Sequence, residues 1–153
     1  MRKALLFLFL ILAAAESIAS DGWKGRVVTV IDGTTLDIAK PDGKIQRVKL
    51  YAVSASTTDN LLGDAARKRT ASWCHQWGDV AEVRPMRQEA EGLLFARVLV
   101  GEDDLADVLT KDCLAKVDLE LCKKNWFPEC VGWHAWELQC RDEKKGIWAT
   151  NVQ

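Results

Sequence analysis

Two Asp-Gly dipeptides near the start of the chain constrain its fold more than any other feature of the sequence. Asp32-Gly33 and Asp42-Gly43 are strong turn signals, because strand-forming residues flank both of them. The flanking segments are the β-branched run 26–31, the run 35–39, and the alternating apolar and polar run 45–53. Three strands joined by two tight turns predict a meander.

The rest of the chain adds helices and two further strands. Apolar spacing predicts helices over about 64–77, 104–111 and 131–145. Strand patterns cover 80–85 and 93–100, on either side of a polar segment. This order predicts an α+β fold, mainly a small β-barrel with helices packed on it. A five-stranded OB-type barrel has this layout.

The first 19 residues have the pattern of a signal peptide. A basic start is followed by a short apolar run and then by small residues at 17 and 19. We therefore expect a signal peptide over 1–19, one domain over 20–153, and an exported protein that is periplasmic or secreted. The alternative is an uncleaved membrane anchor, although the apolar run is short for a span.

The charge of the chain argues against a general nucleic-acid-binding protein. The formal net charge is −1, and removal of residues 1–19 would leave 19 basic and 21 acidic residues, a net charge of −2. Proteins that grip phosphates usually carry a basic excess. We therefore expect nucleic acid not to be the partner, and any polyanion to be held by a local patch.

Six segments of the sequence occur in the order and spacing of one known family. They are V-I-D-G-T-T-L at 30–36, R-V-K-L-Y-A-V at 47–53, G-D-A-A at 63–66, G-L-L-F-A-R-V-L-V at 92–100, C-L-A-K-V at 113–117 and K-G-I-W-A at 145–149. Together these segments resemble the staphylococcal nuclease (thermonuclease) family, over about 25–149. The resemblance implies a five-stranded OB-fold barrel of that type with three helices.

The chemistry of that family is calcium-dependent cleavage of phosphodiesters, and this sequence lacks most side chains for it. Such a site needs carboxylates for the cation, a general base and two guanidinium groups. By position, the resemblance assigns the metal roles to Asp32, Thr34 and Ser54, and the catalytic roles to Lys49, Thr57 and Leu93. Only Asp32 keeps the family's residue, so the resemblance implies a degenerate site with no intact catalytic residue.

The expected function is therefore binding rather than catalysis. Exported proteins similar to this one are associated with exopolysaccharide (succinoglycan) production, so the resemblance implies an accessory role there, with an envelope polysaccharide or protein as partner and no cofactor. The alternative is a divergent secreted Ca²⁺-dependent nuclease acting on DNA or RNA, its site rebuilt from the side chains Asp32, Asp37, Lys49, Glu89 and Glu91.

Candidate binding residues come from charge and aromaticity. Arg47 and Lys49 share a strand face and, with Arg67 and its two basic neighbours, form a candidate basic patch. An ordinary solvated face is the alternative. Trp126 lies in an expected loop, where an exposed aromatic ring can stack on a sugar or contact a partner.

Five cysteines in an exported chain favour disulfides with one thiol left over. Cys122 and Cys130 would close a short loop. The family resemblance implies a second bond between Cys113 and Cys140, which leaves Cys74 as a buried thiol on the apolar face of its helix. A zinc site made by Cys122, Cys130, His134 and Cys140 is a weaker alternative, because the spacing matches no paired motif.

Overall fold

The computed structural model describes residues 22–57, 59–89 and 91–149. The expected signal peptide at 1–19 lies outside these residues. The strands and helices of the described chain follow one another in this order: β1 (Trp23–Val30), β2 (Thr35–Ala39), β3 (Ile45–Leu50), β4 (Val53–Ala55), α1 (Leu61–Gln76), β5 (Val80–Gln88), β6 (Leu94–Val100), β7 (Asp103–Asp104), α2 (Leu105–Lys111), β8 (Ala115–Val117), α3 (Leu119–Lys124), α4 (Glu129–Asp142) and the 3₁₀ turn η1 (Gly146–Trp148).

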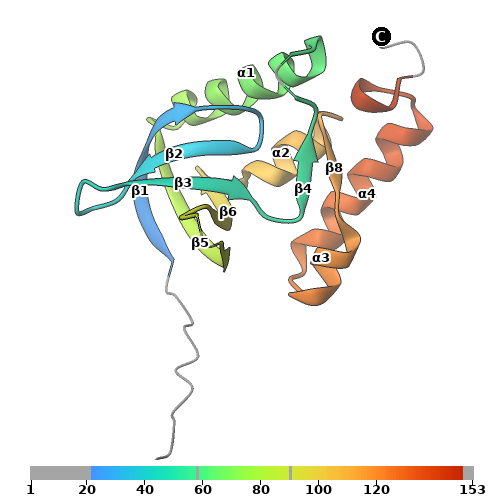
Figure 1. Ribbon diagram of the computed structural model, residues 1–153. Coiled ribbons are helices and arrows are strands. Elements are labelled where there is room, and N and C mark those ends of the chain that lie inside the picture. Colours follow the sequence, from blue (N-terminus) through green and yellow to red (C-terminus); the bar gives the residue numbers. More distant parts are fainter. Residues whose placement is uncertain (1–21, 58, 90, 150–153) are drawn as a thin grey trace, which may run out of the picture.

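Five of these strands close into a barrel (Figure 1). The meander β1–β2–β3 is extended by β5 beside β1 and by β6 beside β5, all antiparallel. A parallel pairing of β3 with β6, in which Lys49 lies opposite Phe95, closes the ring. The protein is therefore an α+β fold with a closed, mixed five-stranded barrel, as expected for an OB-type layout.

The interior of the barrel is filled by alternate residues of its strands, as period-two side-chain geometry requires. Leu36, Ile38, Val48 and Val98 are fully buried there. Burial of each such side chain contributes about 1.5–3 kcal/mol. The barrel is a packed core along most of its length.

Helix α1 lies across the end of the barrel at which β1 ends (Figure 1). There the β1–β2 connection passes so close to the helix that a Cβ on Gly33 would lie 2.6 Å from the Cβ of Ala66. The hydroxyl of Thr70 donates to the carbonyl of Gly33 at 2.7 Å. The helix begins at Leu61, three residues earlier than expected, because Asn60 accepts a hydrogen bond from the amide of Gly63.

The C-terminal helices form a second layer beside the barrel. Helix α2 packs against both β6 and α4, so it lies between the barrel and the last helix (Figure 1). A short two-stranded pairing of β4 with β8 connects the two layers. The carboxylate of Glu137, which is buried, accepts the amide of Val117 at 2.6 Å and fastens α4 to β8.

Several expected boundaries are corrected by the structure. The last helix begins at Glu129 and ends at Asp142, rather than covering 131–145, because Lys144 and Gly146 adopt positive φ angles that break the helix. Strand β5 continues to Gln88. The expected strand 45–53 is divided, because β3 ends at Leu50 and β4 begins at Val53. Helix α3 and strand β8, which have six and three residues, were not expected.

Candidate functional site

Asp32, to which the resemblance assigns a metal role, accepts hydrogen bonds from within its own turn. Its Oδ1 accepts the backbone amide of Thr34 at 2.7 Å and the hydroxyl of Thr34 at 3.1 Å. Thr34 is buried, and its carbonyl accepts the amide of Leu50, which holds the turn against β3. The second metal position is thus a neutral hydroxyl that donates to the first.

The other positions carried over from the family provide little charge. Lys49 lies on β3 between Thr35 and Phe95 of the neighbouring strands. Leu93 is partly buried and immediately precedes β6. Ser54 lies on β4, paired with Lys116 of β8, and the Thr57 hydroxyl donates to Asp59. The barrel brings Asp32, Thr34 and Lys49 to one region, whereas Ser54 belongs to a different sheet.

Four basic residues of the candidate patch are each paired with an acid: Arg47, Arg67, Lys68 and Arg69. The guanidinium of Arg47 makes two 2.9 Å bonds to Asp37 and lowers the pKa of that carboxyl. Lys68 and Arg67 both contact Asp64, at 2.6 and 3.0 Å, and lower its pKa. These ion pairs are exposed and reduce the positive potential that a polyanion would meet.

Neither alternative metal site is assembled among the residues that the structure describes. Asp37, one carboxylate of the rebuilt nuclease site, is held by Arg47. Within residues 22–57, 59–89 and 91–149, no group of three or more acidic, histidine or cysteine side chains is placed to hold a metal ion. The zinc alternative loses its sulfur ligands, because Cys122 bonds to Cys130 and Cys113 bonds to Cys140.

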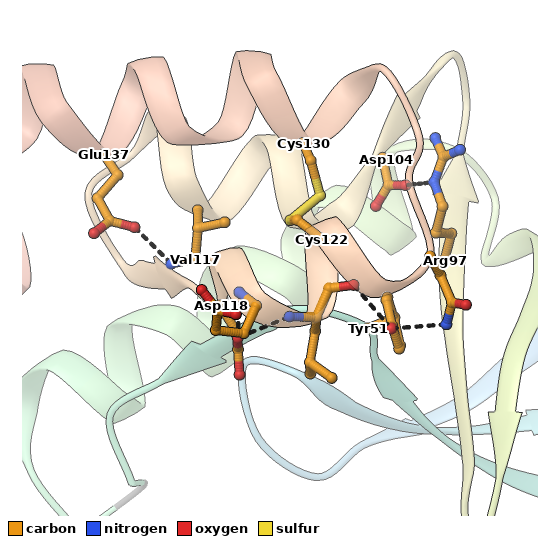
Figure 2. Close-up of a disulfide and its surroundings, with 11 residues drawn as sticks. Tyr51, Arg97, Asp104, Val117, Asp118, Cys122, Cys130 and Glu137 are labelled. Atoms are coloured by element: carbon orange, nitrogen blue, oxygen red, sulfur yellow. Dashed lines mark hydrogen bonds and ion pairs between the residues drawn. A yellow bond between two sulfur atoms is a disulfide. The ribbon is translucent and has the colours of Figure 1, made fainter.

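These two disulfides are the pairs that the sequence analysis expected, and the fifth cysteine, Cys74, is a buried free thiol. Cys122–Cys130 joins α3 to the start of α4 and closes the loop that contains Trp126 (Figure 2). Cys113–Cys140 joins the turn after α2 to α4. Both bonds therefore fix the helical layer, and disulfides of this kind persist in oxidising compartments.

The loop closed by Cys122–Cys130 is packed on one side and exposed on the other. Phe127 is buried, with its ring 5.1 Å from that of Trp133 and 6.3 Å from that of Tyr51. The amide of Asn125 donates to the Tyr51 hydroxyl at 2.9 Å, which donates to the carbonyl of Leu121. Trp126 is 65 % exposed. The loop thus presents an aromatic ring on a fixed backbone.

Beside this loop lies a buried ionic network (Figure 2). Arg97 of β6 contacts Asp104 at 3.0 Å and Glu129 at 2.8 Å, and it lies over the ring of Phe127. Asp104 also caps α2 by accepting the amide of Ala106 at 3.0 Å. Burial raises the pKa of Asp104 to about 6. The network joins the barrel to α2 and α4, which is a structural role.

The barrel is open at the end where β1 begins, and a hollow of about 520 Å³ lies there. Its lining consists of Trp23, Lys40, Gln46, Pro85, Met86, Arg87, Gln88 and Leu94. Sequence reasoning did not find this site. The alternation of side chains along a strand could have located three of the lining residues. Val27, Ile38 and Val48 point into the barrel. Trp23, Lys40 and Gln46 lie an even number of residues from them and therefore share their face.

A search of protein-family models and a search of curated proteins each found no match to this chain. In the part of the chain that the structure describes, no helix is long and apolar enough to cross a membrane.

Proposed function

We propose that the protein is an exported, nuclease-like barrel that binds its ligand without cleaving it. In this proposal it is a degenerate member of the staphylococcal nuclease-like family, with an accessory role in the cell envelope or in exopolysaccharide (succinoglycan) biosynthesis. The order of the barrel strands and the six sequence segments support the family. The two disulfides support a periplasmic or secreted location.

One observation carries the case against catalysis. Asp32 is the single carboxylate left at the positions of the family site, and its Oδ1 accepts hydrogen bonds from the amide and the hydroxyl of Thr34. A Ca²⁺ ion needs six to eight oxygen ligands and usually several carboxylates. With threonine at the general-base position and leucine at the second guanidinium position, the family reaction loses its base and its charge stabilisation.

The first experiment tests catalysis directly. The exported, purified protein is incubated with single-stranded DNA and with RNA, each with Ca²⁺ and with a chelator. We expect no Ca²⁺-dependent cleavage and no Ca²⁺ uptake by titration calorimetry. Cleavage that needs Ca²⁺ and disappears in Asp32→Ala would establish the nuclease alternative.

A second measurement separates the two roles of Asp32. If its carboxylate only accepts hydrogen bonds within the turn, Asp32→Asn keeps the acceptor and leaves the unfolding free energy nearly unchanged. Asp32→Ala removes it and should cost about 1 kcal/mol. A bound Ca²⁺ ion would instead make stability depend on added calcium in the parent protein and not in Asp32→Asn.

Binding is tested with an acidic exopolysaccharide of the bacterial envelope immobilised on a sensor surface. The exposed ring of Trp126 is the proposed contact in the helical layer, so Trp126→Ala should weaken binding. Leu138→Ala, which removes an apolar side chain of α4 that is 51 % exposed, is the control and should not weaken binding. Equal binding by both variants would remove Trp126 from the proposed interface.

A further inference from the structure

Two hollows among the residues that the structure describes have the same volume and opposite charge. Each measures about 520 Å³, which is within the range of about 300–1,000 Å³ for small-ligand sites. The hollow beside α2 and α4 is lined by five carboxylates and one guanidinium: Glu102, Asp103, Asp104, Asp107, Glu129 and Arg97. The hollow at the open end of the barrel has Lys40 and Arg87 in its lining and no carboxylate. An anion is therefore directed to the barrel end.

Strands β1, β2, β3, β5 and β6 build the barrel-end hollow. Trp23 begins β1, Lys40 follows the end of β2, and Gln46 lies on β3 opposite Ile38. Arg87 comes from the far end of β5, where the strand extends beyond β1. Leu94 is buried at the start of β6 and forms part of an apolar floor. The site is thus built on strands, which hold side chains more rigidly than loops do.

The polar groups of this hollow favour a ligand that has both negative charge and hydroxyl groups. The Nζ of Lys40 lies 5.5 Å from the centre of the Trp23 ring, so a cation and an aromatic face occur together. The Nε2 of Gln46 donates to the carbonyls of Arg47 and Gly92, so what this side chain can still offer a ligand is the acceptor Oε1. An acceptor suits a hydroxyl, and the cation suits an acid.

Arg87 is held in place and remains at the rim. Its guanidinium lies 4.4 Å from the centre of the Phe95 ring and contacts Glu89 at 2.9 Å. The side chain is 42 % exposed, so a carboxylate can reach it from solvent. The ion pair with Glu89 offsets part of its charge, which makes Lys40 the stronger anion contact of the two.

We propose that the barrel-end hollow binds a carboxylated sugar, such as a uronic acid unit, with the pyranose ring against Trp23 and the carboxylate near Lys40 and Arg87. The C–H face of a pyranose is apolar and covers an aromatic ring, while its hydroxyls reach Gln46 and Gln88 at the edge. This inference rests on the proposed function, since it assigns a place and a sugar class to the polysaccharide.

The test uses a defined probe. The exported protein is titrated with a galacturonic acid trisaccharide and, as a neutral match, with maltotriose, while intrinsic tryptophan fluorescence is recorded. We expect saturable binding of the acidic trisaccharide and at least tenfold weaker binding of the neutral one. Affinity should fall with salt, because the cations at the rim are exposed to solvent.

Two variants carry the assignment, and each has a matched control. Lys40→Gln and Arg87→Gln should each weaken binding of the acidic trisaccharide, by about tenfold or more for Lys40→Gln. Lys44→Gln, in the same β2–β3 turn, and Arg84→Gln, on the same strand β5, remove equal charge from outside the hollow and should change affinity less than twofold. Circular dichroism confirms that all four variants are folded.

Failure of the inference and failure of the proposed function have different results. If the acidic exopolysaccharide binds the parent and the Lys40→Gln and Arg87→Gln variants equally, the barrel-end assignment is wrong and the function stands. If the trisaccharide binds as expected but the polymer does not, the site stands and the polysaccharide role fails. Three results would overturn the inference: no binding of the galacturonic acid trisaccharide, equal binding of maltotriose, or displacement of the bound galacturonic acid trisaccharide by an oligodeoxynucleotide.

Discussion

The buried carboxylate of Asp104 makes stability depend on pH in a direction opposite to that of most acidic residues. Its side chain is 5 % exposed, and burial raises its pKa from 3.8 to about 6 despite the bonds from Arg97 and Ala106. Between these two pH values the folded protein holds a proton on Asp104 that the unfolded chain releases. The unfolding free energy therefore falls as pH rises from 3.8 to about 6.

The size of this effect follows from the shift. One pKa unit corresponds to about 1.4 kcal/mol, so ionisation of Asp104 should lower the unfolding free energy by about 3 kcal/mol by neutral pH. The substitution Asp104→Asn keeps an oxygen to cap α2, removes the titration, and leaves Arg97 with Glu129. Relative to the parent, this variant should gain about 3 kcal/mol between pH 3.5 and pH 7.

Urea unfolding followed by tryptophan fluorescence at several pH values measures this difference. Because only the difference between parent and variant is used, other titrating groups largely cancel. Asp104→Ala, which also lacks the cap, should lie about 1 kcal/mol below Asp104→Asn at every pH. A parent–variant difference that does not change with pH, or that moves in favour of the parent, would show that the pairing with Arg97 outweighs burial and would refute the reasoning.

Three further predictions follow from the packing. Loss of the Cys113–Cys140 disulfide through paired serine substitutions should cost about 3.5 kcal/mol, against about 2.5 for Cys122–Cys130, since the longer loop restricts the unfolded chain more; chemical denaturation of each variant measures this order. Gly33→Ala should lower the unfolding free energy by about 1–3 kcal/mol, because the added methyl group overpacks against α1. Gly132→Ala adds a methyl group in open space on a helix and should raise the unfolding free energy by up to about 1 kcal/mol in the same assay. Burial raises the pKa of the Cys74 thiol to about 12, so at pH 8 Ellman's reagent should label it only after unfolding, and fast labelling of the native protein would contradict this.

The barrel was predictable because its strands carry strong local signals. The two Asp-Gly dipeptides mark real connections, and Gly43 has the positive φ of a turn glycine. Gly33 is needed for a different reason, which is the close approach of α1. Strand β2 begins only at Thr35, so this first connection is longer than a two-residue turn. A local pattern can locate a turn, but the reason for its glycine is a tertiary contact.

The short elements of the second layer were not predicted, because they contain too few residues to show a repeating pattern of apolar side chains. Strand β8 has three residues, and its partner β4 lies about sixty positions earlier in the chain. The same limit applies to the barrel-end hollow. Period two places Gln46 on the inner face, but only the pairing of β3 with β6 brings it near Arg87 and Leu94. Both cases depend on contacts between distant segments.

Asp32 has a role in the fold that requires no metal ion. Its Oδ1 accepts hydrogen bonds from the amide and the hydroxyl of Thr34, and these bonds hold the β1–β2 connection. The resemblance to the nuclease family assigns a metal ligand to Ser54 and a catalytic guanidinium to Leu93, and these two side chains carry neither an acid nor a cation. The barrel itself depends on interior residues such as Leu36 and Val48, which no catalytic role touches. The proposed binding at the open end of the barrel therefore requires neither a metal ligand nor a catalytic side chain at these positions.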